Sequence, residues 1–340
     1  MSASPLRITV FAKTDLGQSR DHNEDTFLIA DLTTGRSSLM PDVREHALGP
    51  RGSLFMVADG MGGAAAGELA SAMAADVIYR HMSSAWAADT EVSAQRFAYR
   101  MREAVELANG ELYRYAAEHP EVRGMGTTVT MAGVFGTDLY LAQIGDSRGY
   151  LVRAGRAIQL TRDQSLMQRL VDAGEMTEEE AERSERRNII LQALGPDPRV
   201  RVDLSQQALR RGDLLVMCSD GLSGLVRKDE IAERAARQPD LPALCTDLID
   251  LANSRGGPDN ITVVTARFTG EVLPEPDDSD VGYQTYAVEG GEPDTDEHPA
   301  PAVVEPESVP EPREPALPPR ALIIGAAFLA AMAALLLYFS

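Results

Sequence analysis

The chain is short of several residue types, and each shortage narrows its function. Of its 340 residues two are cysteine, Cys218 and Cys245, and the aromatic content is 5%. So few thiols predict a reducing compartment and buried, inert cysteines rather than a disulfide framework. No cluster of Lys and Arg marks a nucleic-acid surface, so we expect no nucleic-acid partner. The first residues lack the apolar core of a signal peptide, and we expect none.

Acidic residues outnumber basic ones, but the excess is unevenly placed. The formal net charge is −20, and residues 271–320 hold 14 Asp and Glu against two Arg. The stretch at about 270–320 also carries 11 of the 20 prolines. Such a composition buries too little apolar surface to fold and repels itself, which predicts a disordered acidic linker. A hydrophobic content of 44% for the whole chain supports a core in the remaining part.

One long apolar run lies near the C-terminal end of the sequence. Residues 321–339 are ALIIGAAFLAAMAALLLYF, without a charged side chain. A run of this length is about what a helix needs to cross the hydrocarbon core of a bilayer, so we expect one transmembrane helix. Arg313 and Arg320 precede it and favour a cytoplasmic location for that side. The sequence thus predicts a single-pass protein of the cytoplasmic membrane with its folded part in the cytoplasm. A buried or partner-packed helix is the alternative.

Residues 6–268 alternate between strand-like and helix-like segments. Apolar and β-branched runs between turn residues predict strands at 27–30, 53–58, 127–135, 139–144, 149–153, 214–218 and 261–268. Helical spacing predicts helices at 66–86, 91–118 and 241–254, and two short ones within 163–187, the second beginning at Thr177. Residues 127–161 have the turn signals of an antiparallel meander. The pattern favours an α+β fold in which antiparallel sheets are covered by helices.

Five short segments place carboxylates where predicted strands begin or end. They are Arg20-Asp21-His22-Asn23-Glu24-Asp25, Ala58-Asp59-Gly60-Met61-Gly62-Gly63, Gly145-Asp146-Ser147-Arg148, Ser219-Asp220-Gly221 and Gly257-Pro258-Asp259-Asn260. A carboxylate at a strand end beside Gly can point into a cleft while the backbone turns away. Converging carboxylates repel one another unless cations lie between them, and hard divalent ions prefer oxygen ligands. The sequence therefore predicts a hydrolytic enzyme with two Mg²⁺ or Mn²⁺ ions.

These segments match the motifs of a known family in residue type and in order along the chain. Two further segments belong to the series, Gly126-Thr127-Thr128 and Leu160-Thr161-Arg162-Asp163-Gln164-Ser165. The chain resembles the metal-dependent serine/threonine protein phosphatases of the 2C type (the PPM family), and their bacterial branch in particular. The likeness covers about residues 8–268, and we expect a phosphatase domain over 6–268 with a flap at about 163–195. The family fold implies a central antiparallel β-sandwich flanked by helices on both faces.

The resemblance also implies a metal-binding role for five residues. Asp59 is expected to bridge two Mn²⁺ or Mg²⁺ ions, and the Gly60 carbonyl to bind one of them. Asp220 and Asp259 are expected to bind the other ion. Asp146, with Asp220, is expected to bind a third and weaker ion. A water that bridges the two main ions would attack the phosphorus.

Four further residues are expected to support this chemistry. Glu24 and Asp25 should hold metal-bound waters, and Asn260 should support the Asp259 loop rather than bind metal. Arg20 should grip the substrate phosphate with its planar guanidinium fork. Arg20, Asp59 and Asp220 are thus the expected catalytic residues.

One position departs from the animal branch of the family. Met61 follows the Asp59-Gly60 pair, where animal members have a His that is proposed as general acid. A thioether cannot donate a proton, so the leaving group needs another acid. His22 lies in the first segment and is either that acid or a structural residue.

The expected substrate is a phosphoserine or phosphothreonine protein, with the enzyme opposing a serine/threonine kinase at the membrane. Two alternatives stay open: a relative that acts on an anti-sigma-pathway protein, and a non-catalytic binding module with the same fold. The charged flap is either a solvated surface or an element that docks substrate. The sequence leaves the oligomeric state and the choice between Mn²⁺ and Mg²⁺ open.

Overall fold

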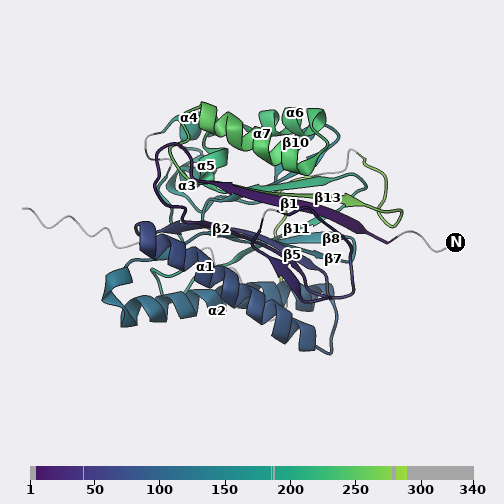
Figure 1. The fold of residues 1–340 in the computed structure, drawn as a ribbon, viewed down its shortest axis with the longest axis horizontal. Coiled ribbons are helices and arrows are strands. Elements are labelled where there is room, and N and C mark those ends of the chain that lie inside the picture. Colours follow the sequence, from purple (N-terminus) through teal and green to yellow (C-terminus); the bar gives the residue numbers. More distant parts are fainter. Residues whose placement is uncertain (1–4, 41, 185, 187, 278–280, 289–340) are drawn as a thin grey trace, which may run out of the picture. The chain divides into compact units, whose positions relative to one another are not determined.

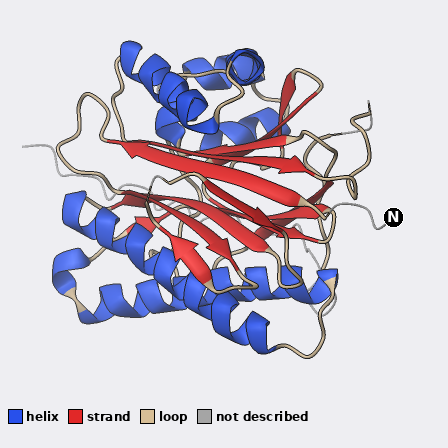
Figure 2. Ribbon diagram, turned by 45° about the vertical axis from the view of Figure 1, so that its right-hand side comes forward, coloured by secondary structure: helices blue, strands red, loops and turns tan. Residues whose placement is uncertain are grey.

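Two antiparallel β-sheets stacked face to face form the centre of the structure, and helices cover both outer faces (Figures 1 and 2). The computed structural model describes residues 5–40, 42–184, 186, 188–277 and 281–288. The helix–sheet–sheet–helix layers match the predicted sandwich with helices on both faces.

All strand pairs within the two sheets are antiparallel. The six-stranded sheet has the order β10 (Arg156–Gln159), β9 (Arg148–Arg153), β12 (Leu214–Cys218), β13 (Ile261–Thr269), β1 (Arg7–Asp15) and β4 (Arg44–Ala47). The seven-stranded sheet has the order β11 (Asp203–Ala208), β8 (Asp138–Ile144), β7 (Val129–Phe135), β5 (Ser53–Met61), β2 (Asp25–Asp31) and β3 (Arg36–Ser38), with β6 (Gly126–Thr127) paired to β5.

Each sheet has its own helical layer. The seven-stranded sheet packs against α1 (Ala64–His81), a π-helical turn (Met82–Trp86) and α2 (Ala94–Glu118). The six-stranded sheet packs against α5 (Asp220–Ser223), α6 (Lys228–Arg237) and α7 (Leu241–Ser254). Two short helices, α3 (Leu166–Asp172) and α4 (Glu178–Arg183), and a 3-10 turn (Pro120–Val122) lie in the connections.

Burial on both faces explains why the central strands are almost continuously apolar. In β5, Leu54 and Met56 face the α1–α2 layer, whereas Phe55 and Val57 face the other sheet. All four side chains are fully buried. A strand in the middle of such a layered fold has no solvent face, so its sequence does not alternate between apolar and polar residues.

The sequence identified most elements but placed one connection wrongly. The predicted strands at 53–58 and 214–218 and the helix at 241–254 are confirmed. The predicted meander over 127–161 is wrong as a single sheet, because β7–β8 lie in one sheet and β9–β10 in the other. The chain crosses between the sheets after Ile144. Strands β1 and β11 and helix α6 were not predicted.

The flap has the predicted pair of short helices. Helix α4 begins with a capping box: the Glu180 N–H donates to Thr177 Oγ1 at 3.2 Å, and the Thr177 N–H donates to Glu180 Oε2 at 2.8 Å. The flap returns to the domain through an antiparallel bridge between Ser165 and Ile190.

The predicted linker begins inside the folded part of the chain, which corrects the expected boundary near residue 270. The Arg211 N–H donates to the Pro274 carbonyl at 2.8 Å, and residues 281–288 pair with β11. Residues 270–277 and 281–288 are therefore part of the domain. Among the described residues, none of the helices has the length and apolar character needed to cross a bilayer. The predicted transmembrane segment, 321–339, lies outside the described residues, as does the linker from 289 on.

Candidate active site

Strand register places carboxylates side by side at one end of the seven-stranded sheet. Asp25 at the start of β2 lies directly opposite Asp59 near the end of β5. Opposed residues of an antiparallel pair project from the same face, and like charges so placed are destabilising. Asp146 follows β8 at the same end of the sheet. Ile144, the last residue of β8, pairs with Val129, and the N–H of the preceding residue, Thr128, donates to the Asp59 carbonyl at 2.8 Å.

The six-stranded sheet contributes Asp220 and Asp259 at the same end. Asp220 follows β12, and Asp259 precedes β13. Ser219 joins the two sheets here: its Oγ donates to Asp25 Oδ2 at 2.7 Å and accepts the Thr262 N–H at 3.0 Å. Sequence reasoning did not single out Ser219, whose signal was its place directly before Asp220.

Asn260 is buried and fastens the loop between β1 and β2. Its Oδ1 accepts the Glu24 N–H at 2.9 Å, and its Nδ2 donates to the carbonyls of His22 at 2.9 Å and Leu16 at 3.1 Å. Its own N–H donates to Asp259 Oδ1 at 2.9 Å. One amide side chain therefore holds the backbone of two carboxylate-bearing loops.

Two glycines allow α1 to lie against this loop. A Cβ on Gly60 would lie 2.2 Å from the carbonyl oxygen of Gly67, and one on Gly67 would lie 1.9 Å from Glu24 Oε2. Backbone atoms leave no room for a side chain at Gly60, whereas at Gly67 a side chain would displace the Glu24 carboxylate. The Gly60 N–H donates to the Glu24 carbonyl at 3.1 Å. Gly67 was not among the predicted site residues, and only the tertiary contact reveals why a glycine stands there.

Burial and mutual repulsion raise the pKa values of the clustered carboxyl groups. Burial raises the pKa of Asp25 to about 7, and the charges of Asp220 and Asp259 add to the effect. Burial likewise raises the pKa of Asp59 well above its ordinary value, and Asp25, Asp220 and Asp146 add to it. The pKa of Asp146 rises to about 7, chiefly through burial. The folded chain therefore places more negative charge here than its own groups neutralise.

Arg20 supplies a positive charge at the solvent side of the cluster. Its Nη2 donates to Asp259 Oδ2 at 2.8 Å, and the Arg20 side chain is 48% exposed. The hydrogen bond to Asp259 raises the pKa of Arg20, and the charges of Glu24 and Asp59 act in the same direction. The guanidinium therefore faces several acidic groups and can also be reached from solvent.

Arg148 is held within the fold instead. Its Nε donates to Asp163 Oδ2 at 2.8 Å, and its Nη1 donates to the Tyr150 hydroxyl at 3.3 Å. Asp163 is itself buried and also accepts from Gln159 at 2.8 Å. Arg148 thus fixes the crossover between the sheets beside Asp146.

The acidic cluster fits a site for hard divalent cations. Within the part of the chain that the structure describes, Asp25 Oδ1 and Asp146 Oδ1 are buried without a hydrogen-bond partner. Among these same residues, no three His, Cys, Asp or Glu side chains already enclose a point at which a metal would be held. Arg20 occupies one oxygen of Asp259, and Ser219 one of Asp25. The donor chemistry therefore fits, and the side chains must turn inward to close on an ion.

The two cysteines and a cavity on another part of the domain do not belong to the acidic cluster. Cys218 and Cys245 are buried, and burial raises the pKa of each thiol to about 12, as the expectation of inert thiols requires. A cavity of about 380 Å³ is lined by Leu6, Leu48 and Phe135, among other residues. Phe135 ends β7 at the edge opposite the carboxylates, so this cavity is separate from the candidate site.

Known proteins share both the sequence and the fold. The family model described as protein phosphatase 2C matches residues 42–256. The serine/threonine phosphatase stp of Listeria monocytogenes is 35% identical over 253 residues, which are 74% of this chain and 92% of the relative. The crystal structure of the Mycobacterium tuberculosis serine/threonine phosphatase PstP/Ppp has a TM-score of 0.65 and 34% identity, and covers 77% of this chain and 99% of that one.

A second PstP structure, of the catalytic domain in complex with two manganese ions, has a TM-score of 0.63 and 33% identity. It covers 78% of this chain and 99% of that one. The two-sheet sandwich with a carboxylate cluster at one end defines a metal-dependent phosphatase fold. The chain belongs to the protein phosphatase 2C family and is a serine/threonine phosphatase of that type.

Proposed function

We propose that this protein hydrolyses phosphoserine and phosphothreonine in proteins with two divalent ions held at the carboxylate end of the sandwich. The observation that carries the proposal is the cross-strand pair of Asp25 and Asp59, joined by Asp146. Like charges directly opposite each other destabilise a sheet, and a cation between them offsets the repulsion. Asp59, the Gly60 carbonyl, Asp220 and Asp259 are the proposed ligands.

Bound ions would supply Lewis acidity, an activated water and charge neutralisation for the phosphoryl oxygens. The chain's own residues orient the substrate. Arg20 exchanges its contact with Asp259 for the phosphate, which suits a guanidinium that is half exposed and already directed at the cluster. Glu24 and Asp25 hold water next to the ligands by accepting hydrogen bonds. Because the Met61 thioether has no acidic proton, the leaving alkoxide takes its proton from another donor.

We further propose manganese or magnesium as the resident metal. The relative described with two manganese ions supports the first choice, and oxygen-only ligands suit both ions. Asp146 is the proposed carboxylate for a third, weaker ion with Asp220, supported by its unpartnered buried oxygen within the described structure.

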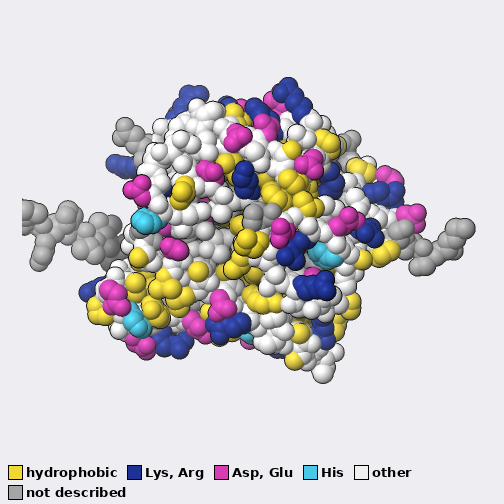
Figure 3. Space-filling model, viewed as in Figure 1, with side chains coloured by type: hydrophobic (Ala, Val, Ile, Leu, Met, Phe, Trp, Pro, Cys, Tyr) yellow, Lys and Arg dark blue, Asp and Glu magenta, His cyan; other side chains and the backbone are white. Residues whose placement is uncertain are grey.

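The proposed partners are a serine/threonine kinase or its targets. Acidic and basic side chains are interspersed on the face drawn in Figure 3, as on a surface that meets proteins rather than nucleic acid. We also propose that residues 321–339 anchor the chain in the cytoplasmic membrane, with the acidic linker as tether. This part rests on sequence alone: the uncharged run and the flanking Arg313 and Arg320. Alkaline extraction of membranes tests it, since an anchored chain stays in the pellet.

Phosphate release from a phosphothreonine peptide by the full chain tests the catalytic proposal. Release should require Mn²⁺ or Mg²⁺, stop in EDTA and fall by about 10³-fold or more in Asp220→Ala. A phosphotyrosine peptide serves as the specificity control. A folded protein that releases no phosphate with either metal would leave the binding-module alternative in its place.

A further inference from the structure

Residues 281–288 lie along the outer edge of the seven-stranded sheet and pair with it through an isolated β-bridge at residues 284–286. Thr285 lies opposite Ser205 in an antiparallel bridge with β11. The Gln206 N–H donates to the Gln284 carbonyl at 2.9 Å, and the Tyr286 N–H donates to the Leu204 carbonyl at 2.8 Å. β11 is the outermost strand of that sheet, so this segment supplies main-chain partners that an edge strand otherwise lacks.

Two tyrosines fasten the segment to the domain. The ring of Tyr286 packs edge-to-face on Tyr140 of β8, with 5.2 Å between ring centroids, and joins the core that α2 covers. The hydroxyl of Tyr283 donates to Asp203 Oδ1 at 2.7 Å. Burial raises the pKa of Tyr283 to about 12, so the hydroxyl keeps its proton at neutral pH.

Asp203 lies two residues from the point at which the base of the flap is anchored. The Arg201 N–H donates to Gln192 Oε1 at 2.7 Å, and the Arg201 carbonyl accepts from Gln192 Nε2 at 2.8 Å. Gln192 Nε2 also donates to Gln164 Oε1 at 2.9 Å. The two ends of the flap are therefore joined to each other and to the residues that lead into β11.

Gln164 carries this network to the candidate active site. Its Oε1 accepts the Gly145 N–H at 2.9 Å, and its own N–H donates to the Gly145 carbonyl at 2.8 Å. Gly145 has a φ of 97° and directly precedes Asp146. A continuous series of hydrogen bonds and short backbone steps thus runs from Tyr283 to the flap base beside Asp146.

From this network we propose that residues 281–288 are positioning residues for the phosphatase reaction. Docked on β11, they hold Asp203 and Arg201 in place, and these hold the base of the flap next to the active site. The inference rests on the proposed function and adds a control on it. The segment lies beyond the family match, which ends at residue 256, and within a stretch whose composition predicts a linker. The beginning of the tail thereby sets the geometry of the substrate-facing flap.

Two proline substitutions in the full chain separate docking from mere presence of the segment. Tyr286→Pro removes the N–H that bonds Leu204 and the ring that packs on Tyr140. Thr285→Pro is the main-chain control, because N–H groups alternate in direction along an antiparallel pair and that of Thr285 points away from β11. It also removes the Thr285 hydroxyl, which donates to the Tyr283 hydroxyl at 3.4 Å, so Thr285→Val is tested beside it. Tyr283→Phe removes only the hydroxyl that reaches Asp203.

Hydrogen exchange and a comparison of two substrates provide the readout, both with Mn²⁺ present. In Tyr286→Pro, exchange at Gln206 and at the flap base, residues 189–192, should quicken about tenfold. The KM for a phosphothreonine peptide should rise about fivefold, while kcat for a small aryl phosphate changes less than about twofold, because a small substrate does not reach the flap. Tyr283→Phe should show a smaller rise in peptide KM, and Thr285→Pro should show no larger a rise than Thr285→Val.

Faster exchange at Gln206 without any change at residues 189–192 or in the peptide KM would overturn the proposal. The segment would then only cover a sheet edge. Failure of the unchanged chain to hydrolyse either substrate with Mn²⁺ or Mg²⁺ would instead count against the proposed function. The exchange comparison would still decide whether the segment holds the flap.

Discussion

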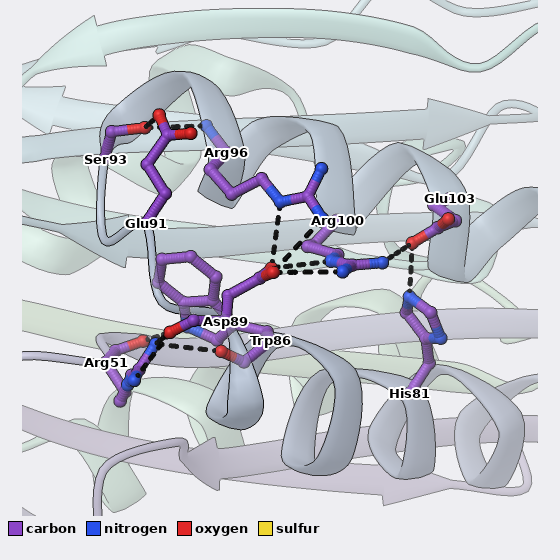
Figure 4. Close-up of polar contacts among 9 residues, drawn as sticks. All are labelled: Arg51, His81, Trp86, Asp89, Glu91, Ser93, Arg96, Arg100 and Glu103. Atoms are coloured by element: carbon purple, nitrogen blue, oxygen red, sulfur yellow. Dashed lines mark hydrogen bonds and ion pairs between the residues drawn. The ribbon is translucent and has the colours of Figure 1, made fainter.

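The molecule treats its carboxylates in opposite ways at two places. At the end of the sandwich, Asp25 and Asp59 oppose each other, and burial with mutual repulsion raises the pKa of both. Between α1 and α2, Asp89 accepts hydrogen bonds from Arg96 at 3.0 Å and Arg100 at 2.7 Å (Figure 4). The hydrogen bond from Arg100 is the main cause that lowers the pKa of Asp89 below its ordinary value.

The helical cluster is neutralised from within the chain. Arg100 also pairs with Glu103, which in turn contacts His81 at 2.8 Å, and Arg51 donates to the Asp89 carbonyl at 3.0 Å (Figure 4). At the sandwich end Arg20 pairs with Asp259, whereas Asp25 Oδ1 and Asp146 Oδ1 are buried without a hydrogen-bond partner in the described part of the chain. Arginine side chains neutralise the acids around Asp89, whereas Asp25 and Asp59 stay opposed. The difference indicates that the second cluster is a site for cations from solution.

The largest expected effect comes from Asp59→Asn, which should change activity and stability in opposite directions. Phosphatase activity should fall by about 10³-fold or more, because a proposed ligand of both ions is lost. In EDTA the free energy of unfolding should rise by about 1 kcal/mol, because the folded state no longer buries an acid whose ionised form burial and its neighbours disfavour. Activity assays and urea unfolding measure the two. Asp76→Asn, at a 62% exposed side chain, is the control: it should leave activity unchanged and lower the free energy of unfolding by about 0.5 kcal/mol or less. Retained activity in Asp59→Asn would contradict the ligand assignment.

Metal addition should stabilise the protein through the sandwich end alone. At a free Mn²⁺ concentration of 100 times Kd, the free energy of unfolding should rise by about 2.7 kcal/mol. Thermal unfolding with and without EDTA measures this gain. Asp259→Asn should shift the required Mn²⁺ concentration upward, whereas Asp89→Asn should leave it unchanged. An equal shift in both variants would contradict the division between the two clusters.

Asp89→Asn should destabilise the fold without affecting the chemistry. It leaves Arg96 and Arg100 without their shared carboxylate in a partly buried setting, which should cost about 2 kcal/mol of unfolding free energy. Urea unfolding at pH 7 measures the loss, and activity per folded molecule should not change. Arg80→Gln, which removes a surface ion pair with Asp76, is the control and should cost about 0.5 kcal/mol or less.

The pH dependence of stability should have opposite signs at the two places. Folded Asp25 and Asp146 keep their protons up to about pH 7, whereas the unfolded chain loses them near 3.8. Because unfolding releases these protons, the unfolding free energy in EDTA should fall as the pH rises through that window, by about 1–2 kcal/mol for the coupled groups. Asp89 contributes the reverse, a stabilisation that is lost as the pH falls below its ordinary pKa. Urea unfolding from pH 2 to 8 should separate the two effects: Asp146→Asn should flatten the fall above about pH 4, whereas Asp89→Asn should reduce the loss below about pH 4. Parallel slopes would refute the comparison.

Sequence patterns predicted candidate site residues from local signals, whereas they placed one connection in the wrong sheet. Asp59 and Asp220 end or follow an apolar run and Asp259 precedes one, and this local property made them candidates. Ser219 and Gly67 were not, because their roles arise from contacts with Asp25 and Glu24, which lie far away in the sequence. Strand β1 was not predicted. Its partner is β13, so its pairing joins the first and last strands of the domain, which lie far apart in the sequence.

The linker shows the limit of composition as a guide. Proline and acidic residues predict that the chain leaves the fold near residue 270, yet residues 281–288 pair with β11. Two tyrosines and a few main-chain hydrogen bonds hold the segment in spite of the acidic, proline-rich composition of the stretch. They can do so because an open sheet edge offers unsatisfied backbone partners. A composition window does not register such a partner.

By itself the sequence determined the family, the class of reaction and the layered α+β fold, and it predicted the carboxylates proposed to carry the chemistry, since these depend on short motifs and on local apolar periodicity. The tertiary structure decided which strands share a sheet, that Asp25 opposes Asp59, that Arg20 contacts Asp259, and that the start of the tail belongs to the domain. The physical reason is that charge repulsion, burial and strand pairing act between residues brought together by folding, whatever their separation along the chain.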